Sequence, residues 1–251
     1  MKRLNFLAWL LVLIAKPLLA VDLDGRIDWS QRIDMSTTVS GVVAEVMVNA
    51  GDKVDKGAVL VRLQPDRFNA ALSSASAAKK DAQYKLKEAE REWERAQELY
   101  ERTVLSDSDL QLAENLLISA QASFAKANAH QINAKRDVIE SVIRAPFPAV
   151  ILQRHVEPGQ TVITRITSVP MISLAALRHY HVVGAVTSTY ANKLTAGQAV
   201  SMTINGKSYN GTLASIGYES IKGTDTYPVT ISLNAGDDVL RVGQAATIHF
   251  P

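Results

Sequence analysis

The chain has 251 residues, with 27 basic and 25 acidic side chains, a formal net charge of +2 and no cysteine. This length accommodates two or three small domains, and the near-neutral charge gives no reason to expect a nucleic-acid partner. The lack of cysteine excludes disulfide bonds, thiolate metal sites, a cysteine nucleophile and a lipid-modified N-terminal cysteine.

Residues 1–20 have the pattern of a secretory signal peptide. Lys2 and Arg3 precede an apolar run that ends at Ala15, and the small residue Ala20 closes the segment. The apolar run is too short to span a bilayer easily, so we expect cleavage after it, with an uncleaved inner-membrane anchor as the alternative. In either case we expect the rest of the chain to be exported, and no later stretch could form a transmembrane helix.

Two similar β-rich stretches, residues 37–65 and 141–177, flank a helical insertion. A shift of 108 residues places the turn that contains Gly51 on the turn that contains Gly159, with valines in matching positions around both. Each half alone is too small to bury a core. We therefore predict one β-sandwich made of both halves, and the alternative is two independent hairpins.

The insertion, residues 66–140, has the spacing of a coiled coil. Apolar residues recur alternately every three and four positions in each half, which is typical of a coiled-coil seam. The first seam comprises Phe68, Leu72, Ala75, Lys79, Ala82, Leu86, Ala89, Trp93, Ala96 and Tyr100, and the second comprises Leu110, Ala113, Leu117, Ala120, Phe124, Ala127, Gln131, Ala134 and Val138. We predict two helices, each about 50 Å long, that fold back on each other as an antiparallel hairpin.

The two polar residues in these seams are predicted to meet. With a turn near Val104 and Leu105, Lys79 and Gln131 fall in the same layer of the hairpin. A buried ammonium is costly unless it has an acceptor, and the amide oxygen of Gln131 provides one. We predict that this pair fixes the register of the hairpin; the alternative is a solvated gap in the seam.

The outer surfaces of the two predicted helices differ in charge. The first helix is dense in acidic and basic residues, whereas the second carries no charge between Asn115 and Ala125. We expect this weakly charged face to pack against neighbouring hairpins.

The remaining residues, 178–251, contain many short β-like runs separated by glycine and asparagine turns. The pair Asn205-Gly206 predicts a two-residue hairpin turn between two of these strands. We predict a small antiparallel β-barrel, to which the N-terminal segment, residues 21–36, contributes a strand.

Few residues suggest chemistry. His179 and His181 share one face of a predicted strand, but two histidines without a cysteine or an acidic third ligand are a weak metal signal. No glycine-rich phosphate loop, nucleophile elbow or paired-carboxylate site is present. We therefore expect no catalytic residues, no metal and no cofactor, and we expect that the protein is not an enzyme.

The arrangement as a whole resembles a known family. The stretch from Thr38 to Leu63 resembles the first half of a biotinyl/lipoyl-type domain, and the stretch from Arg144 to Val162 resembles the second. Split around a helical hairpin and followed by a barrel, these halves resemble the periplasmic adaptor, or membrane fusion, proteins of tripartite efflux pumps (the HlyD/RND efflux adaptor family). The resemblance implies an elongated α+β fold in which a long antiparallel coiled-coil α-hairpin is inserted in a lipoyl/biotinyl-like β-sandwich, followed by a small antiparallel β-barrel.

The hairpin tip carries a further resemblance. Adaptors that dock on TolC-like outer-membrane channels have an arginine, a leucine four residues later and a serine seven residues after that, and Arg95, Leu99 and Ser106 meet this spacing. Arg95 and Leu99 are one helical turn apart and lie off the predicted seam, and Ser106 is a good N-cap for the second helix. We interpret the three residues as the contact with the channel; the alternative is a solvated charge and a simple cap.

The resemblance implies a non-catalytic adaptor in the periplasm, associated with the inner membrane. Its expected partners are an inner-membrane transporter, of RND type in the first instance, a TolC-like outer-membrane channel, and further copies of itself in a ring of three or six, which together export drugs or other small molecules. The chain stops at Pro251, so the membrane-proximal domain of many RND adaptors is expected to be absent or vestigial.

Two alternatives remain at this point. Adaptors of ABC-type or type I secretion exporters can also lack the membrane-proximal domain. A lipoyl or biotin carrier domain is disfavoured because the hairpin replaces the exposed turn that would hold the modified lysine.

Overall fold

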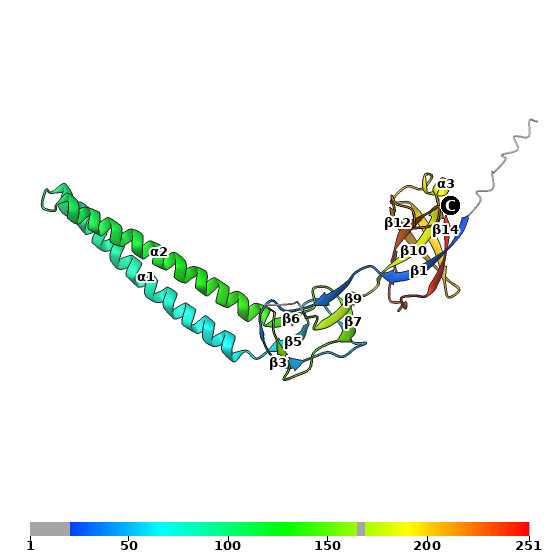
Figure 1. Cartoon of the computed structure of the whole chain (residues 1–251), viewed down its shortest axis with the longest axis horizontal. Coiled ribbons are helices and arrows are strands. Elements are labelled where there is room, and N and C mark those ends of the chain that lie inside the picture. Colours follow the sequence, from blue (N-terminus) through cyan, green and yellow to red (C-terminus); the bar gives the residue numbers. More distant parts are fainter. Residues whose placement is uncertain (1–20, 165–168, 251) are drawn as a thin grey trace, which may run out of the picture. The chain divides into compact units, whose positions relative to one another are not determined.

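The computed structural model describes residues 21–164 and 169–250, and the predicted signal or anchor segment, residues 1–20, lies outside the described residues (Figure 1). The chain forms two compact units. One unit contains the described residues up to Gln31 and those from Arg178 onward, and the other contains the described residues of Arg32–Leu177.

The second unit is built on two four-stranded sheets. The order in one sheet is β2 (Arg32–Met35), β9 (Ile172–Ala176), β7 (Ala149–Arg154) and β4 (Lys53–Val54), and in the other it is β6 (Val142–Arg144), β5 (Val59–Leu63), β3 (Gly41–Val46) and β8 (Thr161–Val162). All neighbouring strands are antiparallel.

The two halves of the repeat exchange strands. Strand β4 of the first half pairs with β7 of the second, and β8 of the second half pairs with β3 of the first. The Gly51 N–H donates to the carbonyl of Ile151, the equivalent Gly159 N–H donates to the carbonyl of Val43, and both bonds measure 2.8 Å. The prediction of one sandwich from two half-domains is therefore confirmed, and the alternative of two independent hairpins is wrong.

The sandwich core draws on both halves of the repeat. Val43 and Leu60 from the first half and Ile151 and Leu174 from the second are almost fully buried in one apolar cluster. Burial of each such side chain stabilises the folded state by about 1.5–3 kcal/mol, so neither half would hold its core without the other.

Helices α1 (Asp66–Glu101) and α2 (Asp107–Glu140) leave the sandwich between β5 and β6 and run side by side to a short turn (Figure 1). Both helices are anchored at the root. Phe68 of α1 is buried in the sandwich cluster, Val138 of α2 packs against it, and the Thr37 hydroxyl donates to the carbonyl of Glu140 over 3.1 Å.

The first unit is a closed barrel of six antiparallel strands. The order around it is β1 (Val21–Trp29), β10 (His179–Thr187), β13 (Thr226–Asn234), β12 (Lys207–Ile216), β11 (Ala199–Ile204) and β14 (Ala245–Phe250), and the short helix α3 (Ser188–Ala191) follows β10. Ile27, Val182 and Ile231 are buried inside it. Asn205 and Gly206 both have positive φ and join β11 to β12, as the Asn-Gly pair predicts.

The N-terminal segment differs from its prediction in one respect. Residues 21–36 are predicted to join the barrel, but only β1 does so, whereas β2 pairs with β9 in the sandwich. The reason is packing, because Ile33 and Met35 of β2 lie against the sandwich core. The 108-residue repeat contains a signal for this assignment. A shift of 108 residues moves β2 onto residues 140–143, which overlap β6, and the two strands occupy equivalent edges of the two sheets.

Candidate functional site

The contact between α1 and α2 follows the predicted stripes over most of their length. Ala82, Ala96 and Ala134 are buried between the helices, and the larger Trp93 and Phe124 are half-buried. Small residues let the helices approach closely, while flanking solvent still reaches the larger rings. The two long helices and their facing stripes are therefore present as expected, and the coiled-coil supercoil itself stays a prediction.

Lys79 and Gln131 meet in the middle of this contact. The Lys79 ammonium donates to the Gln131 amide oxygen over 3.0 Å, and the Gln131 amide nitrogen donates to the Ser76 hydroxyl over 3.2 Å. Both seam residues are half-buried, so the ammonium has a protein acceptor while its edge stays in contact with water. The role of this pair in fixing the register is a proposal that rests on this geometry.

The turn between the helices is short and exposed. Helix α1 ends at Glu101, Thr103 adopts a positive φ of 61°, and the Val104 side chain is 71% exposed. Ser106 caps α2, because its hydroxyl accepts from the Asp109 N–H over 3.3 Å. An exposed apolar residue between two capped helix ends makes this turn a surface that another protein can cover.

The structure places the three predicted channel-contact residues at this end of the hairpin. Arg95 and Ser106 are exposed, and Leu99 is half-buried rather than fully outward. The Arg95 guanidinium donates to both carboxylate oxygens of Glu92, at 2.8 and 3.1 Å. An exposed pair one turn apart on a helix is worth only about 0.3–0.5 kcal/mol, so a stronger acceptor on a partner can take its place.

Tyr100 is predicted to lie in the seam between the helices, but it is exposed at the turn. Its side chain is 41% exposed, and its hydroxyl bonds to the carboxylate of Asp107 across the turn. This hydrogen bond raises the pKa of the Tyr100 phenol above its ordinary value. The sequence analysis missed this contact, although an acidic residue seven positions after the tyrosine and just past the turn is a signal for it.

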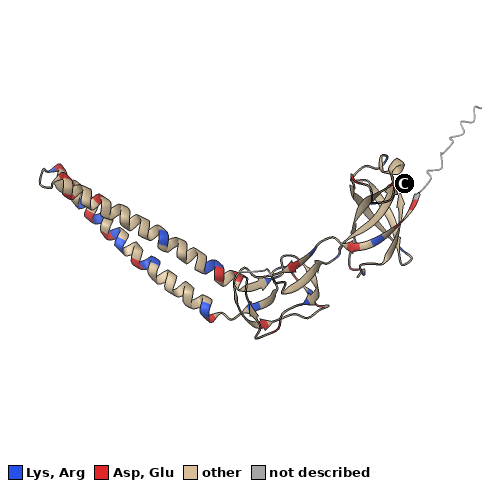
Figure 2. Ribbon diagram, in the orientation of Figure 1, with Lys and Arg blue, Asp and Glu red and all other residues tan. Residues whose placement is uncertain are grey.

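The charges of the two helices are distributed unequally, as expected. Figure 2 shows acidic and basic residues along α1, whereas the middle of α2 between Asn115 and Ala125 carries none. Beside this stretch, nearer the root, a groove of 630 Å³ runs between the helices and is lined mostly by small residues such as Ala71, Ala78 and Ser123.

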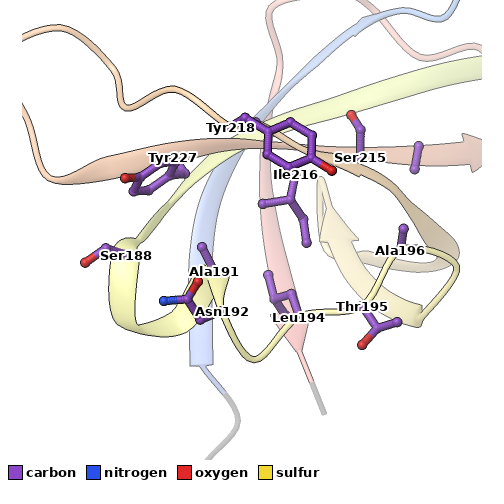
Figure 3. A pocket seen from close by; sticks show the side chains of 12 residues that line it. Ser188, Ala191, Asn192, Leu194, Thr195, Ala196, Ser215, Ile216, Tyr218 and Tyr227 are labelled. Atoms are coloured by element: carbon purple, nitrogen blue, oxygen red, sulfur yellow. The ribbon is translucent and has the colours of Figure 1, made fainter.

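The barrel carries a surface pocket of 680 Å³ that the sequence analysis did not predict. Figure 3 shows its lining, in which Leu194, from the segment after α3, and Ile216 of β12 form apolar walls beside Tyr218 and Tyr227. Among the described residues that line it there is no carboxylate, imidazole or amine.

The two barrel histidines considered for metal binding, His179 and His181, both lie on β10. Among the described residues, 21–164 and 169–250, no three histidine, aspartate or glutamate side chains lie close enough together to hold a metal ion. Within the same ranges, no helix is both long and apolar enough to cross a membrane.

A family model described as "CzcB-like, barrel-sandwich hybrid domain" matches residues 31–173 of this chain. The chain belongs to this family. The match covers the inserted hairpin and the sandwich as far as the start of β9. It confirms the resemblance to periplasmic adaptors of efflux pumps that the sequence motifs indicated.

Two characterised proteins are similar to this adaptor-family chain. The nodulation protein NolF of Rhizobium meliloti (strain 1021) is 26% identical over 216 residues, which cover 85% of this chain and 58% of NolF. The macrolide export protein MacA of Yersinia pestis is 25% identical over 247 residues, which cover 90% of this chain and 66% of MacA. The chain thus spans less than two thirds of the length of either relative.

Solved structures share the fold. The membrane fusion protein Spr0693 of Streptococcus pneumoniae R6 has a TM-score of 0.70 at 22% identity, covering 91% of this chain and 97% of Spr0693. A MacA–MexA chimera that contains the Pseudomonas aeruginosa MexA α-hairpin domain has a TM-score of 0.66 at 23% identity, covering 92% of this chain and 78% of the chimera.

Proposed function

We propose that this chain is a periplasmic adaptor that links an inner-membrane transporter, of RND type in the first instance, to a TolC-like outer-membrane channel. In this role it supports the export of drugs or other small molecules and catalyses no reaction. The observation that carries the proposal is the helical hairpin of a CzcB-like chain, rooted in the sandwich and ending in an exposed turn. The relatives support it, since one is a macrolide export protein and another a membrane fusion protein.

The tip would bind the channel through a small mixed surface. Arg95 exchanges its exposed partner Glu92 for backbone carbonyls at a helix end of the channel, which a guanidinium can contact with several N–H groups at once. Leu99 and Val104 then become buried against the partner. Removal of apolar surface from water supplies affinity, and the arginine supplies orientation.

The inner-membrane partner has a second candidate, an exporter of the ABC type or of type I secretion. The similarity to a macrolide export protein is compatible with either class of transporter. Affinity purification of the tagged adaptor after crosslinking in intact cells would recover one class or the other.

A carrier function for the lipoyl-like sandwich is the rival from another class. The hairpin α1–α2 stands between β5 and β6, where a carrier domain has the tight turn with its modified lysine. Intact mass measurement of the protein from cells would detect a lipoyl or biotin adduct, and such an adduct would refute the adaptor proposal.

The tip contact can be tested with matched variants. We expect Arg95→Ala to weaken capture of the channel about tenfold, the loss typical of one hydrogen bond to a charged group. Arg91→Ala is the control, because Arg91 is also exposed and also paired one turn back, with Glu88, but lies one turn further from the tip. Crosslinking to the channel and drug accumulation in cells lacking the native adaptor measure the effect, and equal results for the two variants would contradict the tip contact.

A further inference from the structure

The pocket beside Tyr218 lies at the mouth of the barrel. Its lining comes from the point where β10 runs into α3, from the end of β12 and from the start of β13 (Figure 3). The mouth of a β-barrel is a common place for a small-molecule site, because the apolar interior of the barrel there comes close to the solvent.

A bulge in β12 supplies one apolar wall of this mouth. Residues of a strand alternate between its two faces, and Leu213 is fully buried in the barrel, so regular alternation would place Ser215 next on the inner face. The register shifts between Leu213 and Ser215, and Ile216 instead lies opposite the buried Val229 of β13. Directly opposite residues share a face, and bulges of this kind re-aim side chains at barrel rims. The bulge thus gives the mouth an apolar side chain where regular alternation would give it a hydroxyl.

Two further side chains complete the inner wall. Tyr227 lies two residues before Val229 on β13, hence on the same inner face, and Leu194 approaches from the segment after α3. Both are half-buried and pack against the barrel core. The side chain of Tyr218, at the rim, is 100% exposed. An exposed aromatic ring beside apolar walls gives a ligand a flat surface to cover.

Backbone contacts hold these walls in place. At the start of α3 the Ser188 N–H donates to the carbonyl of Asp225 over 3.3 Å, and the Ser188 hydroxyl donates to its carboxylate over 3.1 Å. On the other side the Gly217 N–H donates to the carbonyl of Pro228 over 2.7 Å, and a Cβ at Gly217 would lie 2.6 Å from the Pro228 ring. The pocket is therefore formed before any ligand binds, which lowers the cost of ordering on binding.

We propose that the barrel mouth binds a small amphipathic molecule that has a flat, ring-containing apolar body and hydroxyl or carbonyl groups at its edge. The body lies against Leu194 and Ile216 and is covered by the Tyr218 ring. The Asn192 amide, exposed at the rim, donates to the edge groups. The pocket volume of 680 Å³ falls within the range of about 300–1,000 Å³ for such sites. The proposal rests on the export function and deepens it by giving the adaptor itself a site for one class of exported molecule.

Binding can be measured on the full chain with Nile red, an uncharged aromatic dye whose emission rises in apolar surroundings. We expect saturable binding. Tyr218→Ala should weaken it about tenfold, because the ring that covers the dye is lost, whereas Tyr218→Phe keeps the ring and should stay within about twofold of the wild type. Tyr84→Ala is the control and should bind like the wild type, since Tyr84 is also an exposed tyrosine, at 62%, but lies on α1.

The lack of native cysteine allows the site to be located. Ala196 lines the pocket and is exposed, so Ala196→Cys should react readily with a maleimide. With free dye at ten times its Kd, the reaction should slow about tenfold, as the unoccupied fraction falls. Thr212→Cys is the control, because Thr212 is exposed on β12 but does not line the pocket, and its reaction rate should not change.

Three results would overturn the proposal. They are the lack of saturable binding, equal binding by the Tyr218→Ala and Tyr84→Ala variants, and equal protection of the Ala196→Cys and Thr212→Cys variants. The adaptor function has its own readout in the channel capture that depends on Arg95. A protein that captures the channel but binds no dye would refute this inference alone, and one that binds dye but captures no channel would refute the proposed function alone.

Discussion

Replacement of Gln131 by leucine isolates the polar layer inside the hairpin. The variant removes the acceptor of Lys79 and the donor to Ser76, two hydrogen bonds of 3.0 and 3.2 Å. A lost bond to a charged group costs about 1.5–3 kcal/mol when it is fully buried, but Lys79 is half-buried and can extend its ammonium into water. We therefore expect Gln131→Leu to lower the free energy of unfolding by about 1 kcal/mol.

The double variant Lys79→Leu/Gln131→Leu should recover that stability or exceed it. Replacement of both polar partners by apolar residues leaves no unsatisfied group in the layer. Urea unfolding followed by circular dichroism at 222 nm reports mainly on α1 and α2, and the four-variant cycle gives the coupling free energy directly. The control Gln121→Leu changes an exposed glutamine on the same helix and should stay within about 0.5 kcal/mol of the wild type.

This reasoning would be refuted if the changes in the free energy of unfolding of the two single variants added up to that of the double variant. It would mean that water already satisfies Lys79 and Gln131, and that the layer is the solvated gap considered as the alternative. If the pair fixes the register of α1 against α2, the double variant should also form disulfides between cysteine pairs placed one register step apart. The same cysteine pairs should not crosslink in the wild-type background.

Two further predictions concern the sandwich and the barrel. Gly51→Ala and Gly159→Ala should each destabilise the sandwich in thermal unfolding by a similar amount, about 1–2 kcal/mol. Both glycines have positive φ (93° and 86°) and open space where a Cβ would stand. Very different losses for the two variants would contradict the equivalence of the two turns. In the barrel, hydrogen bonds from Lys207 and Tyr209 hold the pKa of Asp238 below its ordinary value of 3.8, so the stability that its carboxylate contributes is present above that value and is lost as the pH falls through the lower folded-state pKa. Asp238→Asn should thus be less stable than the wild type at neutral pH, with a difference that disappears in acid; a constant difference across a pH series of thermal melts would contradict this.

Much of the sandwich and hairpin follows from two sequence periodicities. The 108-residue repeat predicts that both halves form one sandwich, because equivalent turns at Gly51 and Gly159 each need the other half as a partner. The alternation of three and four residues predicts which faces of α1 and α2 meet. Apolar residues with this spacing, such as Ala82 on α1 and Phe124 on α2, form a single stripe along each helix. Both patterns are long, and a few local exceptions do not obscure them.

The ends of these patterns are less predictable. Next to the turn at Thr103 the helices are no longer held from both sides, so Tyr100 is exposed and bonds to Asp107. Leu99, expected off the seam, is half-buried. Strand β2 is too short to show which core it joins until Ile33 and Met35 are seen against the sandwich. The pocket beside Tyr218 depends on segments whose proximity only the closed barrel determines.

The pairing of β5 with β6 at the root of the hairpin has an evolutionary consequence. Because these strands hold the entry and exit of the insertion together, the sandwich does not depend on how far the helices extend. Removing or adding seven residues at matched levels of α1 and α2 would preserve every contact at the root and the spacing of the facing stripes. The hairpin can therefore be lengthened or shortened in steps of about 10 Å without a change in the sandwich that holds it.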